Sequence, residues 1–181
     1  DCLIFDLIED IDSAICFCKK YPLLFNMDYI YEENEDILGL IYISCKNIGN
    51  RKATGSYYTS TKVVRKLISK LDFQENQKIL DPCCGTGNFL LQLPEHISFD
   101  KVYGNDIDTA SVKITRLNMA LKYCVSITAI YEHITELNYL LNYNIHDFQY
   151  IIGNPPWGYE FSEEEKSELH TLFKSASRKN I

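Results

Sequence analysis

Two glycines stand within Asp81–Phe89, between a short apolar run and a run with helical spacing. Glycines at a strand-to-helix turn allow a tight bend and let a ligand approach the backbone. A dinucleotide-binding turn needs a third small residue, and Leu90 occupies that place. No Lys-Ser or Lys-Thr pair follows Gly87, which excludes a P-loop. The turn therefore predicts a ligand site and disfavours a pyrophosphate cofactor.

An acidic residue, Asp106, follows the next predicted strand, 21 residues beyond Gly85. An acid about 20 residues after a glycine turn is placed to accept hydrogen bonds from ribose hydroxyls. Asp106 or Asp108 could also simply cap the helix that follows. We assign the cap to Asp108 and the ribose to Asp106. A ribose without a pyrophosphate indicates an adenosyl cofactor such as S-adenosylmethionine.

A third polar loop, Asn154–Trp157, follows another apolar, strand-like run. Pro155 and Pro156 fix the backbone and remove two N–H donors, so the carbonyl groups of Asn154 and Pro155 can converge as acceptors. Trp157 offers a flat surface for stacking. Such a site suits a planar substrate that carries an exocyclic amine. A proline-rich loop without chemistry explains the prolines but not the Asn and Trp on either side of them.

These segments resemble the S-adenosylmethionine-dependent adenine-N6 DNA methyltransferases. The stretches Ile37–Gly39 and Arg51–Thr59 precede Asp81–Phe89 and Asn154–Trp157, and they look like the N-terminal cofactor motif of the subgroup in which that motif comes first. The likeness is greatest to catalytic parts of bacterial restriction–modification systems, of type I or the fused type II kind. It runs from Ile37 to Trp157.

The resemblance implies a cofactor site for S-adenosylmethionine. Tyr57, Tyr58 and Thr59 would contact the methionine end of the cofactor, and Asp106 would hold its ribose. Asp81 would lie near the methionine amino group, in a pocket shaped by the glycine turn. The residues expected to bind the cofactor are Tyr57, Tyr58, Thr59, Asp81, Pro82, Gly85, Gly87, Asp106 and Glu132.

The resemblance also implies a target site. Asn154 and Pro155 would grip the adenine amine, and Trp157 would stack on the base after it has flipped out of the duplex. The expected catalytic residues are Asn154, Pro155, Pro156 and Trp157. Direct in-line methyl transfer needs positioning and electrostatics rather than a covalent enzyme intermediate, so no cysteine is expected to act as nucleophile.

Two positions depart from the family pattern. Ser60 stands where the family usually has Pro after Thr59, so the helix that follows is expected to begin more loosely. The family often has an acid after the third strand that binds the adenine amine of the cofactor. Here only Glu132 is available for that role.

Two other functions share parts of this pattern. An Asn-Pro-Pro-aromatic loop also occurs in methyltransferases that act on protein glutamine or on RNA. A catalytically silent binding subunit with the same fold is a third possibility, and the intact Asp81, Gly85, Gly87, Asp106 and Asn154 argue against it. The stretch Arg51–Thr59 favours DNA.

The composition fits one domain-sized core. The chain has 181 residues, of which 46% are hydrophobic and 24% charged, which excludes a disordered chain. Residues 1–50 carry the whole net charge of −7, so a uniformly basic nucleic-acid binder is excluded while a local basic face on Arg51–Lys70 is not. The seven cysteines include no C-x-x-C pair. We expect reduced cytoplasmic thiols and no metal site.

The elements that must position these residues alternate along the chain. We expect a helical N-terminal segment over 1–50, with helices at Leu3–Cys18 and Asp36–Lys46. We expect a catalytic domain over 51–181 with a helix from about residue 61, in an order typical of a Rossmann-like α/β methyltransferase fold with a mainly parallel sheet. The expected strands are Lys78–Leu80, Lys101–Asn105, Val125–Ile130 and Phe148–Ile152.

The end of the chain gives a further expectation about completeness. Only 24 residues follow Trp157, and Ser162–Ser175 among them reads as a helix. Methyltransferases of this fold normally have three further strands, so we expect a sheet that is incomplete at the C-terminal side and a chain that is part of a longer enzyme. The chain also begins with Asp1 rather than Met. Double-stranded DNA would be bound through a target-recognition domain or subunit outside this chain, with a restriction or specificity subunit as a further partner and no membrane association.

Overall fold

The structure, a computed structural model, describes residues 10–26, 30, 32–46, 58–142, 147–157 and 161–173. The N-terminal helices are α2 (Ile11–Lys20), α3 (Pro22–Phe25) and α4 (Ile37–Cys45). The other helices are α6 (Thr61–Ile68), α7 (Asn88–Leu91), the 3-10 turn η1 (Phe99–Lys101), α8 (Thr109–Tyr123), α9 (Ile127–His133) and α10 (Glu163–Leu172). The strands are β1 (Ile79–Asp81), β2 (Val102–Asp106), β3 (Ile134–Glu136) and β4 (Tyr150–Ile151).

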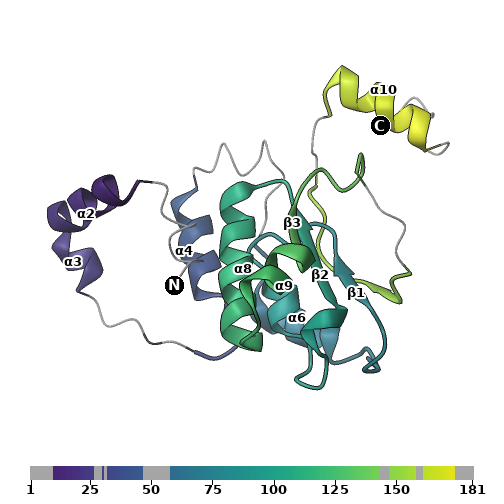
Figure 1. Ribbon diagram of the computed structural model, residues 1–181, viewed down its shortest axis with the longest axis horizontal. Coiled ribbons are helices and arrows are strands. Elements are labelled where there is room, and N and C mark those ends of the chain that lie inside the picture. The colour runs from purple at the N-terminus through teal and green to yellow at the C-terminus, as the bar shows by residue number, and fades with distance from the viewer. Residues whose placement is uncertain are drawn as a thin grey trace.

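The four strands form one parallel sheet in the order β3-β2-β1-β4. Their carboxyl ends therefore lie at one edge of the sheet, from which the turn after β1, the end of β2 and the loop after β4 emerge. Helices α4 and α8 lie side by side next to the sheet, while α2 and α3 stand apart from it (Figure 1). The expected α/β fold, with a mainly parallel sheet after a helical N-terminal segment, is confirmed.

The third strand lies later in the chain than the sequence predicts. Val125–Ile130 alternates like a strand, but Ser126 caps a helix instead, because its hydroxyl accepts a hydrogen bond from the backbone N–H of Ala129 at 3.3 Å. Within that helix Ile130 is buried. The third strand along the chain is instead Ile134–Glu136, which pairs with β2. Local alternation was overridden by the cap and by the burial of one helix face.

The other predicted elements lie close to their expected places. Helix α4 matches the prediction for Asp36–Lys46, and α2 covers the described part of the predicted first helix. Pro22 follows that helix and begins α3. Helix α10 begins at a capping box in which Ser162 and Glu165 bond each other's backbone N–H. Strand β4 pairs with β1 alone among the described strands.

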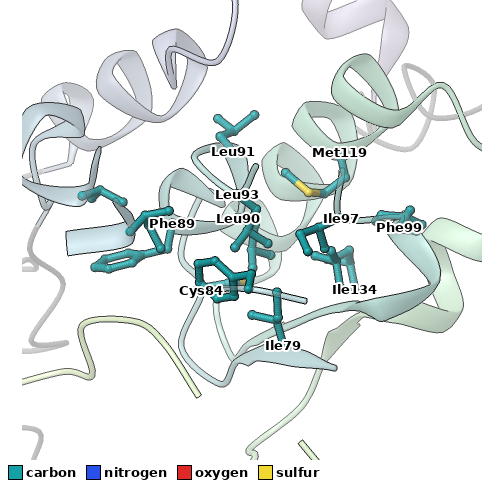
Figure 2. Close-up of a cluster of buried hydrophobic side chains, with 14 of the residues drawn as sticks. Ile79, Cys84, Phe89, Leu90, Leu91, Leu93, Ile97, Phe99, Met119 and Ile134 are labelled. Atoms are coloured by element: carbon teal, nitrogen blue, oxygen red, sulfur yellow. The ribbon is translucent and has the colours of Figure 1, made fainter. Parts of the chain in front are cut away.

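The core lies between the sheet and the helices that pack on it. Leu90 of α7 and Ile79 of β1 are among its fully buried members, and Figure 2 shows them close together in this cluster. Gly104 of β2 makes room for Leu90, because a Cβ there would lie 2.8 Å from the Leu90 Cδ1 atom. Leu90 therefore helps to anchor the helix that follows the glycine turn in the core.

Replacing Leu90 should destabilise the chain strongly. Its side chain is 0% exposed, so Leu90→Ala removes apolar contacts and leaves a cavity. The expected loss is about 2–5 kcal/mol of unfolding free energy, measured by urea denaturation. Leu121→Ala on α8, where the side chain is 52% exposed, is the control and should lose less than about 1 kcal/mol. Equal losses in the two variants would contradict this packing.

Candidate functional site

A cavity opens at the carboxyl edge of the sheet, where the three predicted motifs meet. It is lined by residues from the glycine turn, the end of β2, the stretch before α6, the loop after β4 and helix α4. The predicted site residues that line it are Tyr58, Thr59, Gly85, Asp106 and Asn154. The other lining residues are Ile43, Cys83, Cys84, Thr86, Asn88, Phe89, Asp108 and Ser111. Parts of the chain that are distant in sequence thus share one cavity.

The remaining predicted residues lie around this cavity or away from it. Asp81, Pro82 and Gly87 belong to the strand end and turn beneath it but do not line it. Residues Pro155, Pro156 and Trp157 are exposed beside it. Tyr57 lies outside the described residues.

Glu132 is not placed as the sequence predicted. It belongs to α9, which precedes β3, so it stands before the amino end of that strand rather than after its carboxyl end. The side chain is exposed and does not line the cavity. The error follows from the misplaced third strand. The acid at the carboxyl end of β3 is Glu136, which accepts a hydrogen bond from the Thr109 hydroxyl at 2.7 Å.

The glycine turn is held by its backbone groups. The Gly85 N–H donates to the Asp106 carboxylate at 2.8 Å, and the Gly85 carbonyl accepts from the Thr115 hydroxyl at 2.7 Å. The Thr86 carbonyl accepts from the Asn118 side chain at 2.8 Å. Both Gly85 (φ +54°) and Gly87 (φ +89°) have backbone angles that side chains rarely adopt. The sequence requires glycine at these two positions for this reason.

Asp106 connects the end of β2 to this turn and still has acceptor capacity. One carboxylate oxygen accepts from the Gly85 N–H, and the other accepts from the Asp108 N–H at 2.9 Å. A carboxylate has about four lone-pair positions, so hydroxyl donors in the cavity can also be accepted. Burial raises the pKa of Asp106, while the backbone hydrogen bonds oppose that rise.

Asp108 has the role that the sequence assigned to it. Its side chain accepts from the Ser111 N–H at 3.2 Å and so caps α8. It also accepts from the hydroxyl of Tyr42 on α4 at 2.7 Å and from Lys46, the C-cap residue of that helix, at 3.2 Å. Burial acts to raise the pKa of Asp108, but these hydrogen bonds and the charge of Lys46 hold it below its usual value.

Asp81 is a buried carboxyl with an unused acceptor. The residue is 1% exposed, one oxygen accepts from the Cys83 N–H at 3.2 Å, and Oδ2 has no hydrogen-bond partner. Burial raises the pKa of Asp81 to about 8. Gly153 passes directly over this carboxyl, since a Cβ there would overlap the Asp81 side chain. The loop that carries Asn154 therefore packs against the end of β1.

The Asn154 side chain joins the loop after β4 to the stretch before α6. Its amide donates to the Thr59 hydroxyl at 3.2 Å, across 95 residues of sequence. Its Oδ1 atom accepts from the Trp157 indole N–H at 2.9 Å and has a second lone pair left for another donor. Trp157 is 68% exposed, so its ring has a free face beside the cavity.

Sequence reasoning missed two residues that build this site. Asn88 donates to the Thr59 carbonyl at 2.6 Å and accepts from the Thr61 hydroxyl at 3.3 Å, which ties the start of α6 to the glycine turn. Ile43 on α4 also lines the cavity, and none of the motifs found in the sequence includes it. A polar residue at the first position of a buried helix was the available signal for Asn88. No local signal marks Ile43.

The chemistry of the lining fits a nucleoside that carries a positive charge. The carboxylates of Asp106 and Asp108 line the cavity, and no Lys or Arg is among the described residues that line it. Among these described lining residues a phosphate group would find no cationic partner, whereas ribose hydroxyls, an ammonium group and a sulfonium group all find acceptors or negative charge. Phe89 and Ile43 supply apolar surface for a ring.

The described residues contain neither a metal-ligand cluster nor a membrane-spanning helix. Within the described ranges, no group of three or more His, Cys, Asp and Glu side chains could hold a metal ion. No helix in that part of the chain is long and apolar enough to cross a membrane.

Comparison with known proteins points to one family. The family model described as N-6 DNA Methylase matches residues 33–180. The type II methyltransferase M.VspI of Vibrio sp. (strain 343) is 28% identical over 142 residues, which are 76% of this chain and 34% of that protein. The type I restriction enzyme EcoEI methylase subunit of Escherichia coli is 24% identical over 146 residues, covering 73% of this chain and 30% of that subunit.

A relative from an archaeon shows the same pattern. The type I restriction enzyme MjaVII methylase subunit of Methanocaldococcus jannaschii is 26% identical over 118 residues, which are 61% of this chain and 20% of that subunit. The chain thus spans between 20% and 34% of the length of these curated relatives.

The buried carboxyl of Asp81 predicts how stability depends on pH. Its pKa in the folded chain, about 8, lies above the ordinary value of about 3.9. Between these values the folded chain holds a proton that the unfolded chain has lost. This group should therefore lower the free energy of unfolding as pH rises from 5 to 7, by up to about 1.4 kcal/mol per pH unit.

The measurement is urea denaturation of the wild-type chain and Asp81→Asn across this pH range. The variant lacks the titrating carboxyl. Its unfolding free energy minus that of the wild type should therefore increase as pH rises. Asp147→Asn, at an exposed carboxyl, is the control. An Asp81→Asn difference that stays constant with pH would mean that Asp81 is already ionised in the folded chain.

Proposed function

The chain belongs to the N-6 DNA methylase family, and from this premise we propose that it transfers a methyl group from S-adenosylmethionine to the N6 amine of adenine in DNA. It would do so as the catalytic part of a restriction–modification methylase. The observation that carries the proposal is the shared cavity: Asn154 lines it together with Gly85 and Asp106. A target amine at Asn154 would therefore face a cofactor held by the glycine turn.

The cofactor site follows from the acceptors that line the cavity. Asp106 would accept hydrogen bonds from the ribose hydroxyls, and the backbone at Gly85 would let the cofactor approach closely. Tyr58 and Thr59 would contact its methionine end, with Tyr57 adjacent in sequence. Asp81, Pro82 and Gly87 would support the turn from below. When bound, the cofactor supplies the electrophilic methyl group.

The target site must make a weak nucleophile reactive. The lone pair of the adenine amine is delocalised into the ring, and acceptors at the Asn154 side chain and the Pro155 carbonyl would favour its localisation on nitrogen. Pro156 would keep the second proline bond rigid, so that the acceptors are oriented before the amine arrives. Because an amide is a weak base, the amine proton would leave to water after transfer.

Trp157 would hold the flipped base. Taking a base out of a duplex costs a few kcal/mol, and stacking on an aromatic ring returns about 1–3 kcal/mol. The exposed indole is available for that contact, and its N–H already fixes its position through the bond to Asn154. The residue that stacks on the base and the residue that grips the amine would therefore move together.

DNA recognition would come from a further domain or subunit. The chain has a net charge of −7 and spans at most about a third of the curated relatives named above. Two of those relatives are named as methylase subunits of type I restriction enzymes. We therefore propose double-stranded DNA as the substrate, with a restriction or specificity subunit as partner.

Methyl transfer distinguishes this proposal from its alternatives. The intact protein with radiolabelled S-adenosylmethionine should label duplex DNA that contains adenine, and digestion should recover the label as N6-methyladenine. Asn154→Ala should lower the rate at least about a hundredfold, since it removes an acceptor made for the reacting amine. Labelling of RNA or of a release factor instead of DNA would identify one of the other methyltransferase functions.

The cofactor site predicts a separate binding result. Asp106→Asn leaves one acceptor oxygen where two are needed, so the dissociation constant for S-adenosylmethionine should rise at least about tenfold, measured by calorimetry. Asp100→Asn, at an exposed carboxyl in η1, should bind as the wild type does. Unchanged affinity in Asp106→Asn would show that the ribose lies elsewhere, and absence of heat in the wild type would favour a silent binding subunit.

A further inference from the structure

Asp36 is a carboxylate at the N-cap of α4 that is 0% exposed. It accepts hydrogen bonds from the Gly39 N–H at 2.9 Å, from the Asn118 side chain at 2.9 Å and from the Thr86 hydroxyl. Among the described residues, no Lys, Arg or His forms an ion pair with it. A buried carboxylate without a cation is costly, so these hydrogen bonds must hold it in place.

Capping alone does not explain this burial. Asp10 caps α2 in the same way, by accepting from the N–H three residues later, and it does so in an exposed position. Hydrogen bonding to Ser13 lowers the pKa of Asp10, whereas burial raises the pKa of Asp36. The difference between the two caps is what lies against them. At Asp36 that is the glycine turn of the candidate cofactor site.

Thr86 connects the glycine turn to α4. A Cβ at Gly39 would overlap both the Asp36 carboxylate and the Thr86 hydroxyl, so the backbone of α4 lies directly against Thr86. Asn118 of α8 uses one amide group for two bonds, because it donates to the Asp36 carboxylate and also to the Thr86 carbonyl at 2.8 Å. The side chain and the backbone of Thr86 are thus both tied to Asp36.

The other end of α4 reaches the second loop of the site. Tyr42 donates to the Asp108 carboxylate at 2.7 Å, and Lys46 pairs with the same group at 3.2 Å. Between the two ends, Ile43 lines the cavity. Helix α4 therefore contacts both the glycine turn and the segment that carries Asp106, although it lies outside both motifs.

We propose that Asp36 is a positioning residue for the cofactor turn: through Thr86 and Asn118 it fixes the backbone of residues 84–88, so that the N-terminal helix α4 sets cofactor affinity. The statement about affinity rests on the proposed function, whereas the statement about the turn does not. Asp36 itself touches no ligand in this account.

Hydrogen exchange read out by mass spectrometry tests the turn without any ligand. The Gly85 and Gly87 amides are hydrogen-bonded, to Asp106 and to the Cys84 carbonyl at 2.8 Å. Asp36→Ala should speed exchange in the peptide that covers residues 81–90 at least about tenfold. Asp36→Asn should stay within about threefold of the wild type, because an amide can accept from Gly39 and Asn118 and donate to the Thr86 hydroxyl. Asp10→Ala should leave this peptide unchanged.

Thr86→Val separates positioning from capping and keeps the proposal testable if Asp36→Ala does not fold. The variant keeps the shape of the side chain and leaves the bond between Asp36 and the Gly39 N–H in place. It should speed exchange in the same peptide and raise the dissociation constant for S-adenosylmethionine about tenfold, at a temperature well below its melting point. Exchange and affinity equal to the wild type in Thr86→Val would overturn the proposal, whatever Asp36→Ala does to stability.

Cofactor binding and hydrogen exchange distinguish a failure of the proposed function from a failure of this inference. If the wild-type chain binds no S-adenosylmethionine but the exchange results hold, the proposed function is wrong and the positioning of the turn stands. If the wild-type chain binds the cofactor and the exchange rates of Asp36→Ala match those of Asp10→Ala, the turn does not depend on Asp36 and the inference is wrong.

Discussion

The turn between β1 and α7 must satisfy its own backbone polar groups and yet stay bare enough for a ligand to reach them. Glycine at positions 85 and 87 gives the backbone the angles it needs and leaves the approach open. The hydrogen bonds then come from outside the turn, from Asp106 after β2 and from Thr115 and Asn118 on α8. The strand order, the position of α8 and the burial of Leu90 together hold this turn in place.

The same arrangement gives the site its electrostatic character. Asp36 and Asp106 are carboxylates that are largely removed from water, and burial raises the pKa of each. Backbone and side-chain donors stabilise them in place of basic side chains. Among the described lining residues the carboxylates Asp106 and Asp108 favour a cation with hydroxyls over a phosphate, which agrees with a family whose methyl donor is a sulfonium nucleoside.

The sequence predicted which loops meet at the cavity better than it predicted the elements that support them. Loops that follow parallel strands meet at one edge, so Gly85, Asp106 and Asn154 could be expected in one place from spacing alone. The third strand and Glu132 were misplaced because a short alternating run cannot be told from a capped helix by its pattern. The role proposed for Asp36 could not be predicted, because its partners Thr86 and Asn118 are 50 and 82 residues away. The one signal in the sequence was an N-cap Asp followed by a glycine inside the helix.

The most direct test of the central claim is a crystal structure of the protein grown with S-adenosylhomocysteine, the product that the proposed reaction leaves behind. The ligand should lie in the cavity at the carboxyl edge of the sheet, with its ribose hydroxyls on the Asp106 carboxylate and its sulfur facing Asn154. A ligand bound with its ribose away from Asp106, or with its sulfur turned from Asn154 toward the outside, would contradict that claim.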